Sequence, residues 1–167
     1  MTCFHYEQGV GHVESVALPD IVAAVGSPVY VYSHQHFQSQ YQRLVAALQG
    51  VDANVYYAVK ANSNLAILRC FNALGAGFDI VSGGELQRVL SAGGDPARIV
   101  FSGVGKSTEE LDLALKMGIE CFNVESASEL DRVSARAELL GKVAPIAIRV
   151  NPDVDAQTHP YISTGLK

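Results

Sequence analysis

The sequence predicts an α/β fold in which parallel strands alternate with helices, and three observations support this. Short β-prone runs recur at intervals of roughly twenty to twenty-five residues, the length of one strand, one helix and two short loops. Helical patterns with start and stop signals fill the intervals between these runs. Nearly every run also ends in polar residues, as strands do at the catalytic face of a (β/α)8 TIM barrel.

Two architectures suit consecutive β-then-α units, a doubly wound open sheet and a (β/α)8 barrel. An open sheet concentrates its chemistry at one switch point, whereas a barrel gathers polar groups from the ends of many strands. The polar strand ends therefore favour the barrel. Since only about five units are found where closure needs eight, we expect an incomplete barrel over residues 31–167.

Five strands are expected in the sheet. The first is a near-continuous apolar run, which is typical of a strand buried on both faces. The predicted strands are 54–61, 78–82, 99–103, 121–125 and 145–151.

Helices are expected between the strands, and most carry signals at their ends. Ser33 is a candidate N-cap for a helix that stops at Gly50. Two more helices begin with Ser-x-x-Glu capping boxes, at Ser107 and Ser126. The remaining helices are predicted over 65–74 and 84–92.

Residues 1–30 differ from the rest of the chain. Strands are expected over 13–18 and 29–32, with a short helix near 20–25 and a turn at Ser27-Pro28. We expect this segment to belong to another layer or domain.

Composition excludes several classes of protein. The chain has 167 residues and a formal net charge of −5, so no basic surface indicates a nucleic-acid partner. No apolar run is long enough to span a membrane, and the first residues lack the regions of a signal peptide. The three cysteines are far apart and fit reduced thiols of a cytoplasmic protein better than disulfides or a zinc site.

Lys60 is the leading candidate for chemistry, because it ends the apolar run of the first predicted strand. Near apolar walls, desolvation would lower the pKa of its amine, as a lysine that forms an imine requires. The alternative is an ordinary lysine that reaches solvent from a strand end. Its position alone leaves both interpretations open.

Three charged residues are further candidates. Asp79 and Glu85 flank the end of the second strand, where they could orient a cationic amine or a cofactor imine. Glu85 could instead be a first-turn residue favoured by the helix dipole. Arg149 lies in an apolar run and needs a partner, since an unpaired buried charge is costly. Asp79 and Glu85 are the expected partners.

Two motifs are set aside. The run from Gly103 to Ser107 ends like a phosphate-binding P-loop, but that motif needs a further glycine where Val100 stands. His34 and His36 could bring two rings together, although a surface or capping role is favoured over a metal site. We therefore expect neither a P-loop nor a bound metal.

Six stretches, taken in order, resemble the alanine-racemase-like (fold type III) pyridoxal-phosphate-dependent decarboxylases. The resemblance extends over about 29–167, and the last stretch is most similar to the bacterial diaminopimelate decarboxylases within this family. The stretches are 57–62, 74–86, 101–107, 123–126, 148–152 and 159–167.

The resemblance implies a cofactor and a site. Lys60 is then the lysine to which pyridoxal 5'-phosphate is covalently linked, and Asp79, Glu85 and Arg149 are charged residues that bind around it. Residues 159–167 form a loop over the site, and residues 1–30 join a C-terminal β-domain. The full-length protein is expected to be a cytoplasmic homodimer. The further parts of the family's site cannot be placed on 1–167, so the chain alone is expected to be inactive.

The resemblance also implies a reaction, decarboxylation of the small amino acid meso-2,6-diaminopimelate to L-lysine. Two alternatives remain at this point. One is a decarboxylase of a related substrate, such as carboxynorspermidine or ornithine. The other is a pyridoxal-phosphate-binding protein without catalytic activity.

Overall fold

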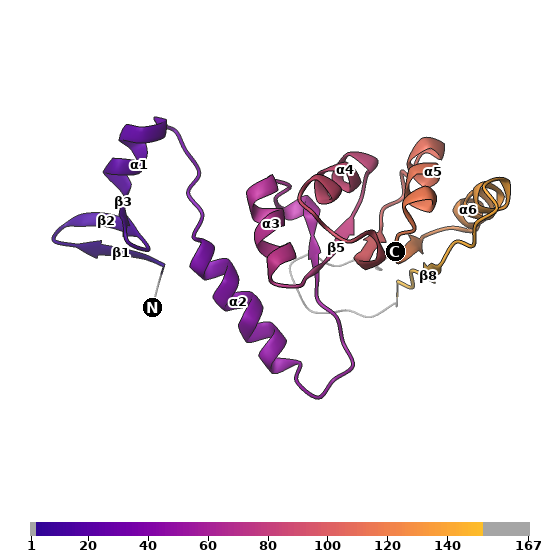
Figure 1. Cartoon of the computed structure of the whole chain (residues 1–167), viewed down its shortest axis with the longest axis horizontal. Coiled ribbons are helices and arrows are strands. Elements are labelled where there is room, and N and C mark those ends of the chain that lie inside the picture. The colour runs from indigo at the N-terminus through magenta and orange to yellow at the C-terminus, as the bar shows by residue number, and fades with distance from the viewer. Residues whose placement is uncertain (1–2, 152–167) are drawn as a thin grey trace.

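A parallel five-stranded sheet forms the centre of the protein in the computed structural model, which describes residues 3–151 (Figure 1). Its strands follow each other in the order β4-β5-β6-β7-β8, and each pairs in parallel with the next. The strands are β4 (Tyr56–Ala58), β5 (Gly77–Ile80), β6 (Ile99–Phe101), β7 (Cys121–Val124) and β8 (Ile146–Ile148). The predicted parallel, sequential order is confirmed, and it is that of a partial α/β barrel.

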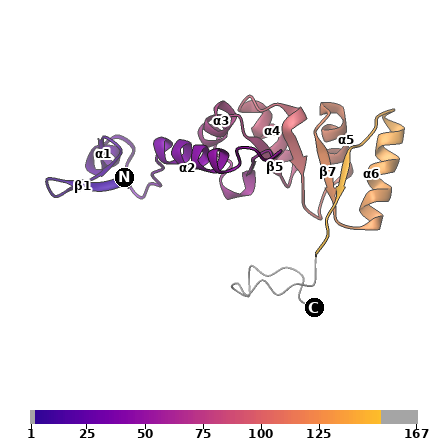
Figure 2. The same ribbon diagram turned by 90° about the horizontal axis from the view of Figure 1, so that it is seen from below.

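Four helices alternate with these strands and lie along one side of the sheet (Figure 1 and Figure 2). Between them, alternate strand residues such as Phe78, Ile80 and Phe122 are buried. The intervening strand residues point to the other side of the sheet, because strand side chains alternate. The helices are α3 (Leu65–Ala73), α4 (Gly83–Ser91), α5 (Thr108–Met117) and α6 (Ala127–Leu139).

The strands are shorter at their carboxyl ends than the sequence predicted. β4 ends at Ala58, and Lys60 lies in a single 3-10 turn, Val59–Ala61. The same holds for β6 and β8, which end before Ser102 and Arg149. Lys60, Ser102 and Arg149 therefore belong to the segments that follow their strands, where their side chains are not confined to the pleat of the sheet.

The predicted helix starts at Ser33 and Ser107 are confirmed in detail, whereas at Ser126 only the serine half of the predicted capping box forms. Helix α2 (His34–Ala47) begins after Ser33, whose hydroxyl accepts a hydrogen bond from the His36 amide (3.0 Å). Ser107 and Glu110 form the complete capping box of α5. Glu110 does more than close its own box, because its other oxygen accepts the Gly83 amide at the start of α4 (2.7 Å). One carboxylate thus holds the first turns of two neighbouring helices.

Replacing Glu110 by glutamine is expected to destabilise the protein at neutral pH by about 1 kcal/mol, the usual cost of a lost cap. Amide groups of Ser107 and Gly83 donate to this carboxylate and hold its pKa below the ordinary value of 4.5. Because the pKa is lower in the folded state, the stabilisation is present above pH 4.5 and is lost as the pH falls through the folded pKa. Urea unfolding of both forms at pH 7 and below pH 4 checks this, and a constant difference would contradict it.

The N-terminal residues form a separate antiparallel sheet in the order β1-β2-β3. It stands apart from the parallel sheet, and α2 lies between the two (Figure 1). The helix predicted near 20–25 is confirmed as α1. The predicted strand 13–18 is interrupted by a turn at Glu14, and the strand predicted over 29–32 is wrong, because this segment has no ladder partner among the described residues. The elements are β1 (Phe4–Glu7), β2 (Val10–Val13), β3 (Val16–Ala17) and α1 (Leu18–Val25).

At the amino-terminal ends of the strands, Gly77 of β5 lies opposite Tyr56 of β4. A Cβ atom at Gly77 would come within 2.4 Å of the Tyr56 ring and 2.9 Å of the Arg98 carbonyl oxygen. The ring is held in place, because its hydroxyl donates to Glu120 (2.5 Å). The residue at this position therefore has to be glycine for the sheet to close without strain.

Replacing Gly77 by alanine is expected to cost about 1–3 kcal/mol, as overpacking of a close-packed interior does. Gly105→Ala is the matched control, because a Cβ there meets no atom within 4 Å. Thermal unfolding of both variants measures the difference. Equal melting temperatures for the two variants would contradict the close contact.

Among residues 3–151, no helix is both long and apolar enough to cross a bilayer. No group of three or more metal-binding side chains lies together in the same part of the chain. Cys3, Cys70 and Cys121 are free thiols. The loop predicted over 159–167 lies outside the described residues.

Candidate active site

The predicted site residues gather at the carboxyl ends of the parallel strands. Lys60 follows β4, and Ala58 at the end of β4 is the register partner of Asp79 in β5. Arg149 follows β8 at the far edge of the sheet. In a barrel of this kind, this is the face that carries the chemistry.

The Lys60 ammonium group is exposed. Within residues 3–151 it has no hydrogen-bond or ion-pair partner, so its amine is free to react. The apolar surroundings expected from the sequence are not supplied by this part of the chain. The strand ends before the lysine. In the 3-10 turn that follows, Val59 is buried in the core, whereas Lys60 is exposed.

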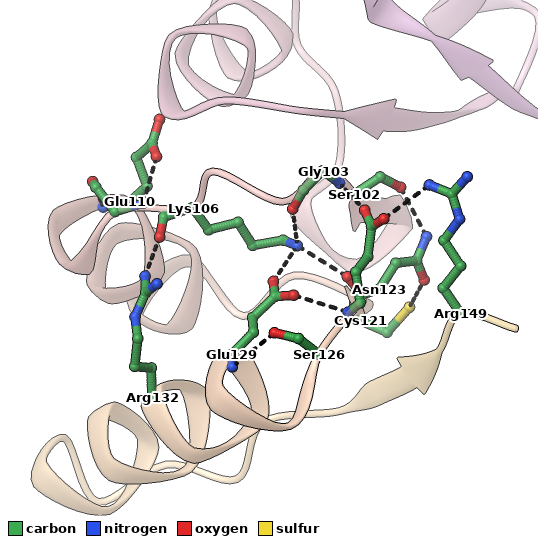
Figure 3. A network of polar contacts seen from close by, with 12 residues as sticks. Ser102, Gly103, Lys106, Glu110, Cys121, Asn123, Ser126, Glu129, Arg132 and Arg149 are labelled. Carbon is green, nitrogen blue, oxygen red and sulfur yellow. Dashed lines mark hydrogen bonds and ion pairs between the residues drawn. The ribbon is translucent and has the colours of Figure 1, made fainter. Parts of the chain in front are cut away.

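A directed series of hydrogen bonds links β7 to Asp79, and Figure 3 shows the part of it formed by Cys121, Asn123 and Ser102. The Asn123 amide donates to the Ser102 hydroxyl (2.8 Å), which donates to the Asp79 carboxylate (2.5 Å). The Cys121 thiol donates to the side-chain oxygen of Asn123, Oδ1, at 3.7 Å. Burial raises the pKa of Cys121, and the charges of Glu120 and Asp79 add to the shift, so the thiol keeps its proton and donates. Each donor stabilises the negative charge of Asp79.

Arg149 pairs with Glu125, and the predicted pairing with Asp79 or Glu85 is wrong. Its Nη1 atom lies 2.9 Å from Glu125 Oε2, and its Nε atom lies 3.3 Å from Asn151 Oδ1. The reason is the strand order, since Glu125 follows the neighbouring strand β7. Asp79 and Glu85 belong to the β5 unit, three strand spacings or about 14 Å away. The side chain is also 44% exposed and not part of the core.

Glu85 occupies the first turn of α4, as its alternative interpretation proposed. Its Oε2 atom accepts the Val81 amide at 2.7 Å, which fixes the turn between β5 and α4. A role of Glu85 in binding a cofactor stays a prediction.

Lys106 belongs to the P-loop-like run that the sequence analysis set aside. It is only 2% exposed. Its ammonium group pairs with Glu129 (2.6 Å) and donates to the backbone carbonyls of Gly103 (2.7 Å) and Asn123 (2.9 Å). Figure 3 shows the side chain directed into this group of acceptors. All three protons of the ammonium are used inside the protein, so this lysine cannot bind a phosphate as a P-loop lysine does.

A hollow of about 360 Å³ opens beside these groups. Its charged and polar lining comes from the ends of three strands, β6, β7 and β8, and combines a carboxylate, an amide, a hydroxyl and a guanidinium. The lining residues are Ser102, Asn123, Glu125, Ala147, Ile148 and Arg149. Such a lining suits a polar, charged small molecule better than an apolar one.

The residues present fit the aldehyde end of pyridoxal phosphate. A free amine at Lys60 is the group that forms a covalent link with an aldehyde. Asp79, with its charge stabilised by Ser102, lies one strand away and would favour positive charge nearby. The donor set is thus that of an imine site and not of a metal site.

Four residues of this arrangement were missed as site residues in the sequence: Ser102, Asn123, Glu125 and Lys106. The first three were visible only as polar strand ends. Lys106 could have been found from Glu129, because a second Ser-x-x-Glu box places a carboxylate at a fixed helix position where a buried cation can meet it.

Comparison with known proteins agrees with this geometry. Residues 34–167 match the family described as "Pyridoxal-dependent decarboxylase, pyridoxal binding domain". Diaminopimelate decarboxylase of Pseudomonas aeruginosa is 56% identical over 167 residues, which is all of this chain and 40% of that protein. The chain therefore spans about 40% of the length of this curated relative.

Two solved structures are similar as well. The crystal structure of diaminopimelate decarboxylase from M. jannaschii in co-complex with L-lysine has a TM-score of 0.90 and 37% identity, over 99% of this chain and 40% of that one. The Helicobacter pylori enzyme complexed with L-lysine has a TM-score of 0.85 and 47% identity, over 89% of this chain and 38% of that one.

Proposed function

The chain belongs to the pyridoxal-dependent decarboxylases, matching their pyridoxal-binding domain, and we propose that the full-length protein decarboxylates meso-2,6-diaminopimelate to L-lysine. The observation that carries the proposal is the free Lys60 amine, placed beside Asp79 at the carboxyl ends of the sheet. The choice of substrate is supported by 56% identity to a diaminopimelate decarboxylase over the whole chain. L-lysine, the expected product, is the ligand in both solved structures described above.

Pyridoxal phosphate, when bound, supplies an aldehyde and a conjugated ring that delocalises the electron pair left by the loss of carbon dioxide. The chain's own residues would hold and orient it. The Lys60 amine would make the covalent link. Asp79, its charge fixed by Ser102, favours positive charge close to that link. Arg149, held by Glu125, offers a cation to an anionic group across the hollow.

The remaining predictions belong to the same proposal. Residues 31–167 form the first part of the pyridoxal-phosphate barrel. Residues 1–30 join a C-terminal β-domain, which agrees with the separate sheet that they form. Glu85 contributes to the charged surroundings of the cofactor. The full-length protein works as a homodimer in the cytoplasm, on an amino-acid substrate.

The test is a substrate comparison with the full-length protein and added pyridoxal phosphate. Release of carbon dioxide and formation of L-lysine are measured with meso-2,6-diaminopimelate, and the amine products are measured with ornithine and carboxynorspermidine. The expected result is turnover of diaminopimelate in clear preference to the others. Preference for ornithine or carboxynorspermidine would show that the protein is a decarboxylase of a related substrate. Cofactor binding without any turnover would support a non-catalytic role.

A further inference from the structure

The buried Lys106–Glu129 ion pair is not used by the proposed reaction, yet it is the most enclosed charged group in the described residues. The lysine side chain is fully buried, and that of Glu129 is 6% exposed. A buried pair of this kind seldom adds net stability over a well-packed apolar pair. Its presence therefore calls for a second explanation, and its contacts supply one.

The pair holds the two loops that follow β6 and β7. Lys106 donates to the carbonyl of Gly103 in the first loop and to that of Asn123 at the end of β7. The second oxygen of Glu129 accepts the amide of Glu125, two residues beyond Asn123 (2.8 Å). Three backbone groups, one in the loop after β6, one at the end of β7 and one just beyond β7, are thus fixed by one buried centre.

From this centre the contacts continue to the site. Glu125 accepts the Gly103 amide through Oε1 (3.0 Å) and Arg149 through Oε2. Both backbone polar groups of Gly103 are consequently held: Lys106 binds its carbonyl, and Glu125 binds its amide. Lys106 also binds the backbone carbonyl of Asn123. The side chain of this residue donates to Ser102, which in turn donates to Asp79. Asp79, which Ser102 contacts, and Arg149, which lines the hollow, are both oriented by residues that the pair fixes.

We propose that Lys106 and Glu129 are positioning residues, which set the geometry of the site by fixing Gly103, Asn123 and Glu125. This inference rests on the proposed function for its consequence in catalysis, but not for its structural content. It also explains the lysine of the Gly-x-Gly-Lys-Ser sequence, because this lysine binds the carbonyl of Gly103 in its own loop. The lysine serves the protein's own backbone, and not a nucleotide.

The test variant is Lys106→Met/Glu129→Gln in the full-length protein. It removes both charges, keeps the volumes, and leaves an amide oxygen at residue 129 to accept the Glu125 amide. The matched control is Asp112→Asn/Arg136→Gln. That pair joins α5 to α6 with contacts of 2.6 and 2.7 Å but does not touch the strand ends.

Three measurements separate positioning from simple stability. Pyridoxal phosphate is titrated and followed by visible absorbance and induced circular dichroism. Hydrogen exchange is measured by mass spectrometry on peptides covering 102–106 and 123–126. The KM and kcat for meso-2,6-diaminopimelate are determined last.

The expected result is a folded test variant in which cofactor affinity or kcat falls by about 10- to 100-fold, as small misplacements can cause. Exchange in both peptides is also faster. The control keeps the affinity, kcat and exchange of the unsubstituted protein. A test variant that matches the control in cofactor affinity and exchange would overturn the proposal.

Two further outcomes remain decisive. If the unsubstituted protein binds pyridoxal phosphate without turning over diaminopimelate, the proposed substrate fails while affinity and exchange still decide this inference. If the test variant does not fold, Glu125→Gln replaces it. This substitution retains the buried pair and weakens only the contacts of the Glu125 side chain with Gly103 and Arg149. Unchanged cofactor affinity in Glu125→Gln would then count against the proposal.

Discussion

Replacing Lys60 by alanine in the full-length protein is expected to abolish decarboxylation, with a loss in kcat of at least about a thousandfold. Among residues 3–151, it is the only lysine placed at the end of β4, next to the strand that carries Asp79. Holding a reactant covalently in a productive orientation is worth about 7–11 kcal/mol in favourable cases, and the substitution removes this entirely. The measurement is single-turnover formation of L-lysine from meso-2,6-diaminopimelate.

Lys116→Ala is the control for this substitution, because Lys116 is an exposed lysine on α5 and is expected to be dispensable. Borohydride reduction of the unsubstituted protein with bound cofactor, followed by peptide mapping, identifies the lysine directly. We expect the label on Lys60. A label on Lys106 or Lys116 would show that the reactive lysine has been assigned to the wrong position.

Replacing Lys106 alone by methionine is expected to destabilise the protein by about 3–5 kcal/mol. The substitution leaves Glu129 buried without its partner, and an uncompensated buried charge costs this much. It also leaves the Gly103 and Asn123 carbonyls without their shared donor. Urea unfolding at pH 7 measures the loss.

Removing the Glu129 charge as well is expected to recover most of that stability, because the cost arises from the unpaired carboxylate. By contrast, Arg136→Gln breaks a pair whose side chains are 27% and 20% exposed, so a clearly smaller loss is expected there, because water screens the pair. If Lys106→Met were no more destabilising than Arg136→Gln, the buried pair would not be the rigid centre described above.

Local signals in the sequence predicted the helices and the order of the strands well. Ser33 and Ser107 begin helices where their side-chain oxygens cap the first turn, since capping depends on residues only three positions apart. The sequential order followed from short connections between units. The strand ends were predicted too long, because apolar character continues past Ala58 into the turn that carries Lys60.

The pairing of charged residues could not be predicted in the same way. Arg149 and Glu125 lie 24 residues apart and meet because β7 and β8 are neighbours with a specific register. The sequence showed that Arg149 needed a partner, but not which strand end would supply it. Lys106 was missed for the same reason, since Glu129 becomes its partner only after α6 has packed beside the loop that follows β6.

The sequential strand order has a consequence for the way the protein is made. Each unit pairs with the unit before it, and Glu110 and Glu129 reach back to amide groups or side chains of the preceding unit or loop. These contacts join residues of consecutive units, 27 and 23 positions apart, and not residues from distant parts of the chain. During synthesis, each unit leaving the ribosome would find the sheet edge and helix end that it needs already formed. Assembly can therefore proceed in the direction of translation, one unit at a time.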